Sequence, residues 1–125
     1  MAKGVDDSVF DAALDLIATS TIMTMCSQQP TTRTEAITTY MLADVTMTPG
    51  DGNGDFTISN GDASGRKLRV TAQAGEAVTN SGAGTYIALC DGSTLLCWTS
   101  CTSIDVLDSG TVDFPAWDYE LTDPT

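Results

Sequence analysis

The side chains of this chain that could do chemistry are its carboxylates and its four cysteines, because the sequence has no histidine. Without histidine it lacks the commonest general base and the usual activating partner of a serine or cysteine nucleophile. The cysteines are Cys26, Cys90, Cys97 and Cys101, and their spacing contains no CxxC pair that would indicate a zinc site. No pair of carboxylates is marked as catalytic. We therefore expect a protein that is not an enzyme and that holds no metal or cofactor.

Disulfides are the other chemistry open to the cysteines. A two-residue Asp-Gly turn directly after Cys90 would place Cys90 and Cys97 on one face of a hairpin, about 13 Å apart along the strand and beyond disulfide reach. Cys97 and Cys101 have similar spacing, so any bridge within the chain would need Cys26. We favour buried free thiols, because we expect the chain to fold in a reducing compartment.

The segment from Asp51 to Asp62 resembles a calcium-binding loop. Oxygen-bearing side chains lie at positions 1, 3, 5 and 12 of this segment, and an apolar residue lies at position 8. However, Phe56 stands where such a loop needs glycine, and the short Asp62 stands where it needs a bidentate glutamate. The alternative is a Gly-Asp turn between two strands, which we favour.

Three of the five basic residues lie close together, at Arg66, Lys67 and Arg69. Such a cluster could dock on an acidic partner. The simpler interpretation, which we favour, is a solvated strand face whose cations pair with nearby aspartates.

Several aromatic residues could form a platform on which sugars stack, or, as we favour, could lie in the core and in a subunit interface. They are Tyr40, Tyr86, Trp98, Phe114, Trp117 and Tyr119. Phe114, Trp117 and Tyr119 lie near the C-terminal end, and Pro115 among them favours an edge strand because proline donates no ladder hydrogen bond. We predict that this segment forms the interface of a homo-oligomer. The alternative is that Trp117 fills the core of its own chain.

One helix and a series of short strands must position these side chains. The helix is expected over Ser8–Ala18, capped by Asp6 or Asp7, with a Phe10/Leu14/Ile17 face packed on a sheet. Runs of β-branched and apolar residues separated by Gly, Asp and Asn turns predict strands at Thr21–Ser27, within Ala36–Met47, and at Phe56–Ser59, Lys67–Ala72, Glu76–Thr79, Thr85–Cys90, Thr94–Thr99, Thr111–Phe114 and Trp117–Leu121. This pattern predicts a mainly β fold, a single-domain β-sandwich or barrel over residues 1–125 with one short N-terminal helix.

Charge excludes several partners. The chain has 17 acidic and 5 basic residues, for a net charge of −12. It would repel the phosphates of nucleic acid and the anionic lipids of a membrane. The sequence has neither the apolar run of a membrane helix nor the basic start of a signal peptide, so we expect synthesis and folding in a cytoplasm.

Three segments resemble small virion proteins of tailed phages: NGDASGRKLRV (Asn60–Val70), YIALCDGSTLLCWTSC (Tyr86–Cys101) and SGTVDFPAWDYELTDPT (Ser109–Thr125). The last resembles the C-terminal signature of phage head-decoration proteins. The segment DAALDLIATS (Asp11–Ser20) and the QQPTTRTEA loop are also similar to that group. The resemblance therefore covers most of the chain, whereas the PGDGNGD insert and the four cysteines depart from the usual pattern.

This resemblance implies an all-β domain that binds the outside of a capsid lattice as an oligomer and has no enzymatic activity. The implied partners are the phage major capsid protein and copies of the chain itself, in a homotrimer or a homodimer. The implied location is the capsid surface of the virion, after synthesis in the host cytoplasm. The alternative function is a phage tail or fibre module that uses the aromatic residues to bind a receptor or glycan.

Overall fold

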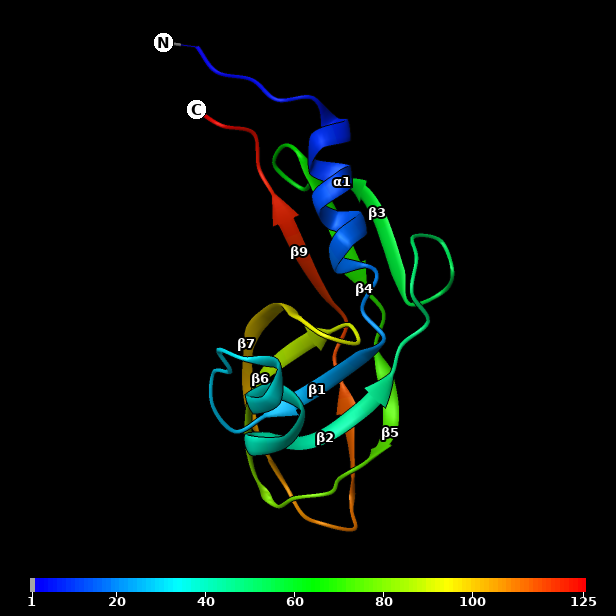
Figure 1. Ribbon diagram of the computed structural model, residues 1–125, viewed down its shortest axis with the longest axis vertical. Coiled ribbons are helices and arrows are strands. Elements are labelled where there is room, and N and C mark those ends of the chain that lie inside the picture. Colours follow the sequence, from blue (N-terminus) through cyan, green and yellow to red (C-terminus); the bar gives the residue numbers. More distant parts are fainter. Residues whose placement is uncertain (1) are drawn as a thin grey trace.

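The computed structural model describes residues 2–125, which form one α-helix, one short π-helical segment and nine strands (Figure 1). This confirms the expected mainly β class with one short N-terminal α-helix. The elements in chain order are α1 (Asp7–Ile17), β1 (Ile22–Cys26), η1 (Glu35–Thr39), β2 (Met41–Thr46), β3 (Phe56–Asn60), β4 (Arg66–Val70), β5 (Gln73–Ala77), β6 (Gly82–Cys90), β7 (Leu95–Val106), β8 (Thr111–Phe114) and β9 (Trp117–Leu121).

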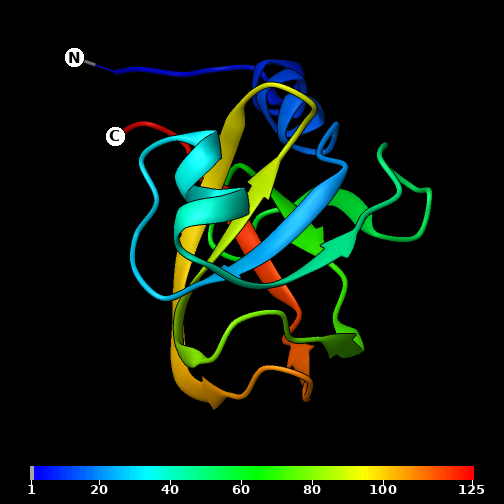
Figure 2. The same ribbon diagram turned by 60° about the horizontal axis from the view of Figure 1, so that its bottom comes forward.

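The largest sheet is antiparallel with strand order β2-β1-β6-β7, and its central strands are covered on both faces. On one face, Met23 and Met25 of β1 enter the main core. On the other, Cys26 lies in a second buried cluster with Ala36 of the η1 segment. Figure 2 shows η1 in front of this sheet. Burial on both faces explains why β1 does not alternate between buried and exposed residues; four of its five residues are apolar, and Thr24 is buried as well.

Strands β4 and β5 run antiparallel to β9 and β8 as one interrupted ribbon. Val70 pairs with Trp117, and Gln73 pairs with Phe114 in the same register. The two residues between them therefore lie opposite Ala116 and Pro115, and Pro115 cannot donate a ladder hydrogen bond. The ribbon consequently divides at this point into the β3-β4-β9 sheet and the β5-β8 pair.

Helix α1 packs on the β3-β4-β9 sheet at the end of the molecule that carries both chain termini (Figure 1). Asp6 caps the helix, because its carboxylate accepts a hydrogen bond of 3.1 Å from the Ser8 N–H. Leu14 is fully buried, and Arg66 of β4 reaches Asp11 of the helix at 2.8 Å. The expected helix and its cap are thus present, with bounds shifted by one residue. Of the expected face, Leu14 is buried and Ile17 packs against the core, whereas Phe10 is only partly buried.

One main buried cluster joins α1 to all three sheets. Its largest members include Phe56 of β3, Leu68 of β4, Ile87 of β6 and Phe114 of β8. The sheets therefore share a single main core, and the edge strands described below are held on a fixed body.

Two local predictions were wrong. The first part of Ala36–Met47 is the π-helical segment η1, and strand β2 begins only at Met41. The turn after Cys90 spans four residues rather than two, since Cys90 pairs with Leu95. The Asp91 carboxylate accepts hydrogen bonds from the two N–H groups at the end of this turn, which closes it without a positive φ at Gly92.

Candidate interaction surface at the open strand edges

The four-stranded sheet ends in β2 and β7, and the three-stranded sheet ends in β3 and β9. The edge position of β9 confirms the prediction made from Pro115. Alternate backbone N–H and C=O groups of an edge strand point away from its sheet, so the β7 and β9 edges offer hydrogen-bonding groups to another molecule.

The β7 edge is long and carries little charge. It spans twelve residues, and from Leu95 to Ile104 it contains no charged side chain, proline or glycine. Natural edge strands are commonly short or are protected by lysine or proline. Two irregularities in the pairing with β6 interrupt this edge, one at Leu96 and one opposite Thr85 of β6. Between them, the segment Cys97–Ser100 is the part of the edge that is open and regular.

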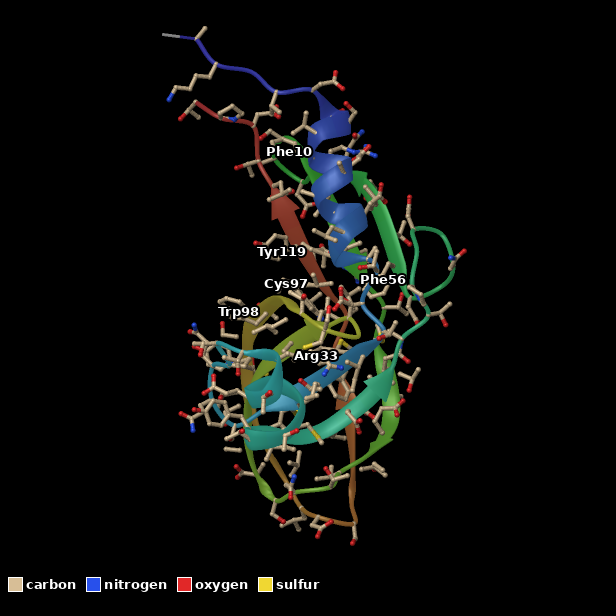
Figure 3. The ribbon with its side chains drawn as sticks, in the orientation of Figure 1. Phe10, Arg33, Phe56, Cys97, Trp98 and Tyr119 are labelled. Atoms are coloured by element: carbon tan, nitrogen blue, oxygen red, sulfur yellow. The ribbon has the colours of Figure 1, made fainter. Side chains whose placement is uncertain are left out.

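A pocket with a volume of about 340 Å³ lies where the β7 and β9 edges approach each other. Leu96, Cys97 and Trp98 of β7 line one side, and Tyr119 of β9 lines the other. Figure 3 shows Cys97, Trp98 and Tyr119 gathered at this junction. Trp98 is 39% exposed. The pocket therefore combines aromatic surface with strand-edge backbone, which suits an apolar side chain, a short extended peptide or a sugar ring.

The C-terminal aromatic residues do not form the surface expected from the sequence. Phe114 is only 1% exposed and belongs to the main core, so it cannot contact a partner and its assignment to an interface was wrong. It points inward because the four residues of β8 alternate between solvent and core. Trp117 packs against the same core, and within residues 2–125 its buried Nε1 has no hydrogen-bond partner. Of the three, Tyr119 alone lines the pocket.

The basic cluster is paired within the chain. Arg66 binds Asp11, Lys67 lies 2.7 Å from Asp62, and Arg69 lies 3.1 Å from Asp118. The hydrogen bond to Asp11 raises the pKa of Arg66, and the one to Asp62 raises the pKa of Lys67. Arg66 also faces the helix rather than the side of the sheet that carries Lys67 and Arg69, as strand alternation requires. The three residues are close in the sequence, but in the structure their side chains form ion pairs on two opposite faces of the sheet.

All four cysteines are free thiols, and they divide between the two buried clusters, with Cys26 and Cys90 in the second cluster and Cys97 and Cys101 in or against the main core. An irregularity at Leu96 shifts the register by one residue after the turn, so Cys97 pairs with Leu89 and enters the main core, whereas Cys90 lies in the second cluster. The expectation that Cys90 and Cys97 share a face was therefore wrong. Burial raises the pKa of Cys97 to about 12 and that of Cys90 to about 11. It also raises the pKa values of Cys26 and Cys101.

The Asp51–Asp62 segment is a turn followed by strand β3. The Asp51 carboxylate accepts the Ile58 N–H at 2.9 Å, and the Asp55 carboxylate accepts the Thr48 N–H at 2.7 Å. Phe56 is fully buried, and the strand that it begins carries Asp62 away from the other oxygen ligands. Among residues 2–125, no group of three or more acidic or cysteine side chains is placed to hold a metal ion.

Comparisons with protein-family models, with curated proteins and with solved structures found no match to this chain. Within the part of the chain that the structure describes, no helix has the length and apolar character needed to cross a membrane.

Sequence reasoning missed the pocket. Trp98 was recognised only as one of several aromatic residues, and Leu96 was not considered. The available signal was the uncharged run Leu95–Ile104, which is unusually long for a strand that ends a sheet.

Proposed function

We propose that this chain is a structural virion protein that binds the outside of a tailed-phage capsid and stabilises the shell, as a dimer or trimer. The observation that carries the proposal is the open, uncharged β7 edge beside the pocket of Trp98 and Tyr119. The resemblance of most of the chain to phage head-decoration proteins supports the choice of a capsid as the partner.

The physical properties of the surface suit this role. A cement protein must stay soluble when free and must bind through many identical contacts when it meets a lattice. The net charge of −12 keeps free copies apart. The strand edge and the pocket supply directional hydrogen bonds and an aromatic anchor, which are the features that interface cores use.

The test compares virions that contain the protein with virions that lack it. We expect both to assemble, and we expect those without the protein to lose their genome at lower temperature or milder osmotic shock. Equal survival of the two preparations would rule out the cement role.

A substitution in the pocket tests whether this surface, rather than another part of the protein, binds the shell. Trp98→Ser should weaken binding to shells, because it removes the exposed aromatic anchor. Leu107→Ser is the matched control, since Leu107 is 74% exposed and lies outside the pocket. Equal loss of binding in the two variants would show that the pocket has no special role.

The same pocket also suits a second function, the binding of a glycan. Tyr119 and the exposed Trp98 line the same pocket, and a sugar ring could stack on such aromatic surface, as in a tail or fibre module that binds a glycan receptor. A glycan array probed with the wild-type chain and with Trp98→Ser tests this alternative. Specific glycan binding that the substitution abolishes would support it over the capsid role.

A further inference from the structure

Helix α1 carries a second apolar face that the core does not cover. Successive residues of a helix advance by about 100°. Val9, Ala12, Ala13 and Leu16 therefore gather on one side, at positions i, i+3, i+4 and i+7, and we call this set the outer face of α1. Val9 is 56% exposed and Leu16 is 58% exposed, and both alanines are exposed as well. The core-facing side is a different one, centred on the fully buried Leu14.

A third side of the helix is acidic. Asp7, Asp11 and Asp15 recur every four residues and form a ridge along the outer face. Asp11 is engaged by Arg66, whereas within residues 2–125 Asp7 and Asp15 make no ion pair. The outer face is thus an apolar strip with carboxylates along one border.

This distribution is unusual for a helix that packs on one sheet. Such a helix normally has one apolar stripe toward the core and polar residues on the opposite side. Here the side opposite the core presents a valine and a leucine, two helical turns apart, and the charged residues are confined to the ridge. Figures 1 and 2 both place α1 at the periphery of the molecule, beside the two termini. A second surface can therefore reach the outer face.

We infer that the outer face of α1 docks into an apolar groove bordered by lysine or arginine side chains on another protein. The inference rests on the proposed function in one respect, because it takes that other protein to be the capsid shell.

Charge selects such a partner over a second copy of the chain. The chain carries −12, and its clustered cations Arg66, Lys67 and Arg69 are already paired with its own aspartates. Two copies joined through α1 would bring together two acidic ridges on chains that each carry −12. One helix face also covers less than the roughly 800 Å² per partner of a stable protein interface, so it needs support from another contact or from favourable charge. A basic border on the partner supplies that charge.

The test measures binding of the purified full-length chain to shells of the encoding phage from which the protein has been removed. The double variant Val9→Gln/Leu16→Gln keeps helix-compatible side chains and removes the apolar strip. We expect it to bind at least about tenfold more weakly than the wild type. Leu107→Gln is the matched control, because it removes an even more exposed leucine in the turn between β7 and β8, at the other end of the molecule (Figure 1).

A second pair of measurements tests the charge. Wild-type binding should weaken as the salt concentration rises, and Asp7→Asn/Asp15→Asn should bind more weakly at low salt and depend less on salt. Circular dichroism confirms that each variant is folded.

The outcomes are distinguishable. Absence of binding by the wild type would remove the proposed function and this inference together. Wild-type binding that both Val9→Gln/Leu16→Gln and Leu107→Gln leave unchanged would overturn the inference and leave the proposed function standing. Sedimentation that shows self-association lost in Val9→Gln/Leu16→Gln, and strengthened by salt in the wild type, would identify a second copy as the occupant and would also overturn it.

Discussion

At the scale of single residues, burial decides what the cysteines can do. The thiolate is the reactive form of cysteine, and burial opposes its formation. Cys26, Cys90 and Cys97 are buried, whereas Cys101 is partly exposed. With its pKa near 12, Cys97 stays protonated even beside the pocket.

We therefore predict that iodoacetamide at pH 8 modifies Cys101 first in the folded protein and reaches the other three only after unfolding. Mass spectrometry of digested samples gives the order, and Cys101→Ala should abolish the early modification. Early modification of Cys97, or an intrachain disulfide in the native protein, would contradict this account.

Two leucines of the same helix provide a direct test of which side of α1 belongs to the core. Leu14 is fully buried and Leu16 is 58% exposed. Leu14→Ala should lower the free energy of unfolding by about 2–5 kcal/mol, because it leaves a cavity. Leu16→Ala should change it by less than about 0.5 kcal/mol. Chemical denaturation measures both, and similar losses in the two variants would show that the helix packs differently.

The turn between β6 and β7 yields a prediction about pH. Its Asp91 carboxylate accepts hydrogen bonds from the backbone N–H groups of Ser93 and Thr94, which lower the pKa of Asp91 in the folded state. A group with a lowered folded-state pKa stabilises the fold above its unfolded-state pKa, and this contribution is lost as the pH falls through the folded value.

Asp91→Ala should therefore lower the melting temperature at pH 7, and the difference from wild type should shrink as the pH falls below about 4. Comparing the two proteins removes the common effect of neutralising the other carboxylates. A difference that stays constant from pH 7 to pH 3 would show that the carboxylate does not hold the turn.

At the scale of elements, one glycine fixes the junction of β3, β4 and β9. Gly65 has a φ of +68°, and a Cβ at this position would collide with the carbonyl oxygen of Leu121. Gly52 also has a positive φ, +81°, but a Cβ there would meet no atom within 4 Å. Gly65→Ala should thus cost more than about 2 kcal/mol of stability, and Gly52→Ala about 1 kcal/mol. Equal costs would show that the close approach of β9 is not tight.

The elements differ in how far the sequence could predict them. Helical spacing and a capping aspartate were enough for α1, and turn residues located most strands. The hairpin register was missed because the Asp91 side chain closes a four-residue turn and β7 has an irregularity at Leu96, and an Asp-Gly pair reveals neither. The η1 segment was read as strand because Ile37 and Tyr40 suit either structure when their partners in the second cluster are unknown.

The candidate site was harder to predict than the fold. Pro115 correctly indicated an edge strand, but the direction of Phe114 depends on which face of β8 meets the core, and that is a tertiary property. The pocket joins β7 to β9, strands from two different sheets, so no local pattern could bring Trp98 and Tyr119 together. The outer face of α1 was not predicted either, because helical spacing relates Val9 to Leu16 but only the tertiary packing shows that the core leaves both exposed.

At the scale of the whole molecule, one core holds two separate exposed features in a fixed relation. The pocket lies at the junction of the β2-β1-β6-β7 and β3-β4-β9 sheets. Helix α1 covers the β3-β4-β9 sheet, and its outer face lies on the side away from that sheet. A body with two such contacts could bridge neighbouring subunits of a lattice, and many bridges of this kind would stabilise a shell even when each contact is weak.

The most direct test of this account is to titrate the purified chain onto shells that lack it and to count the bound copies by quantitative mass spectrometry. The capsid role predicts saturable binding at a copy number set by the repeating positions of the lattice, together with recovered resistance to heat. Absence of binding, or saturation at a few copies confined to the tail, would contradict the account.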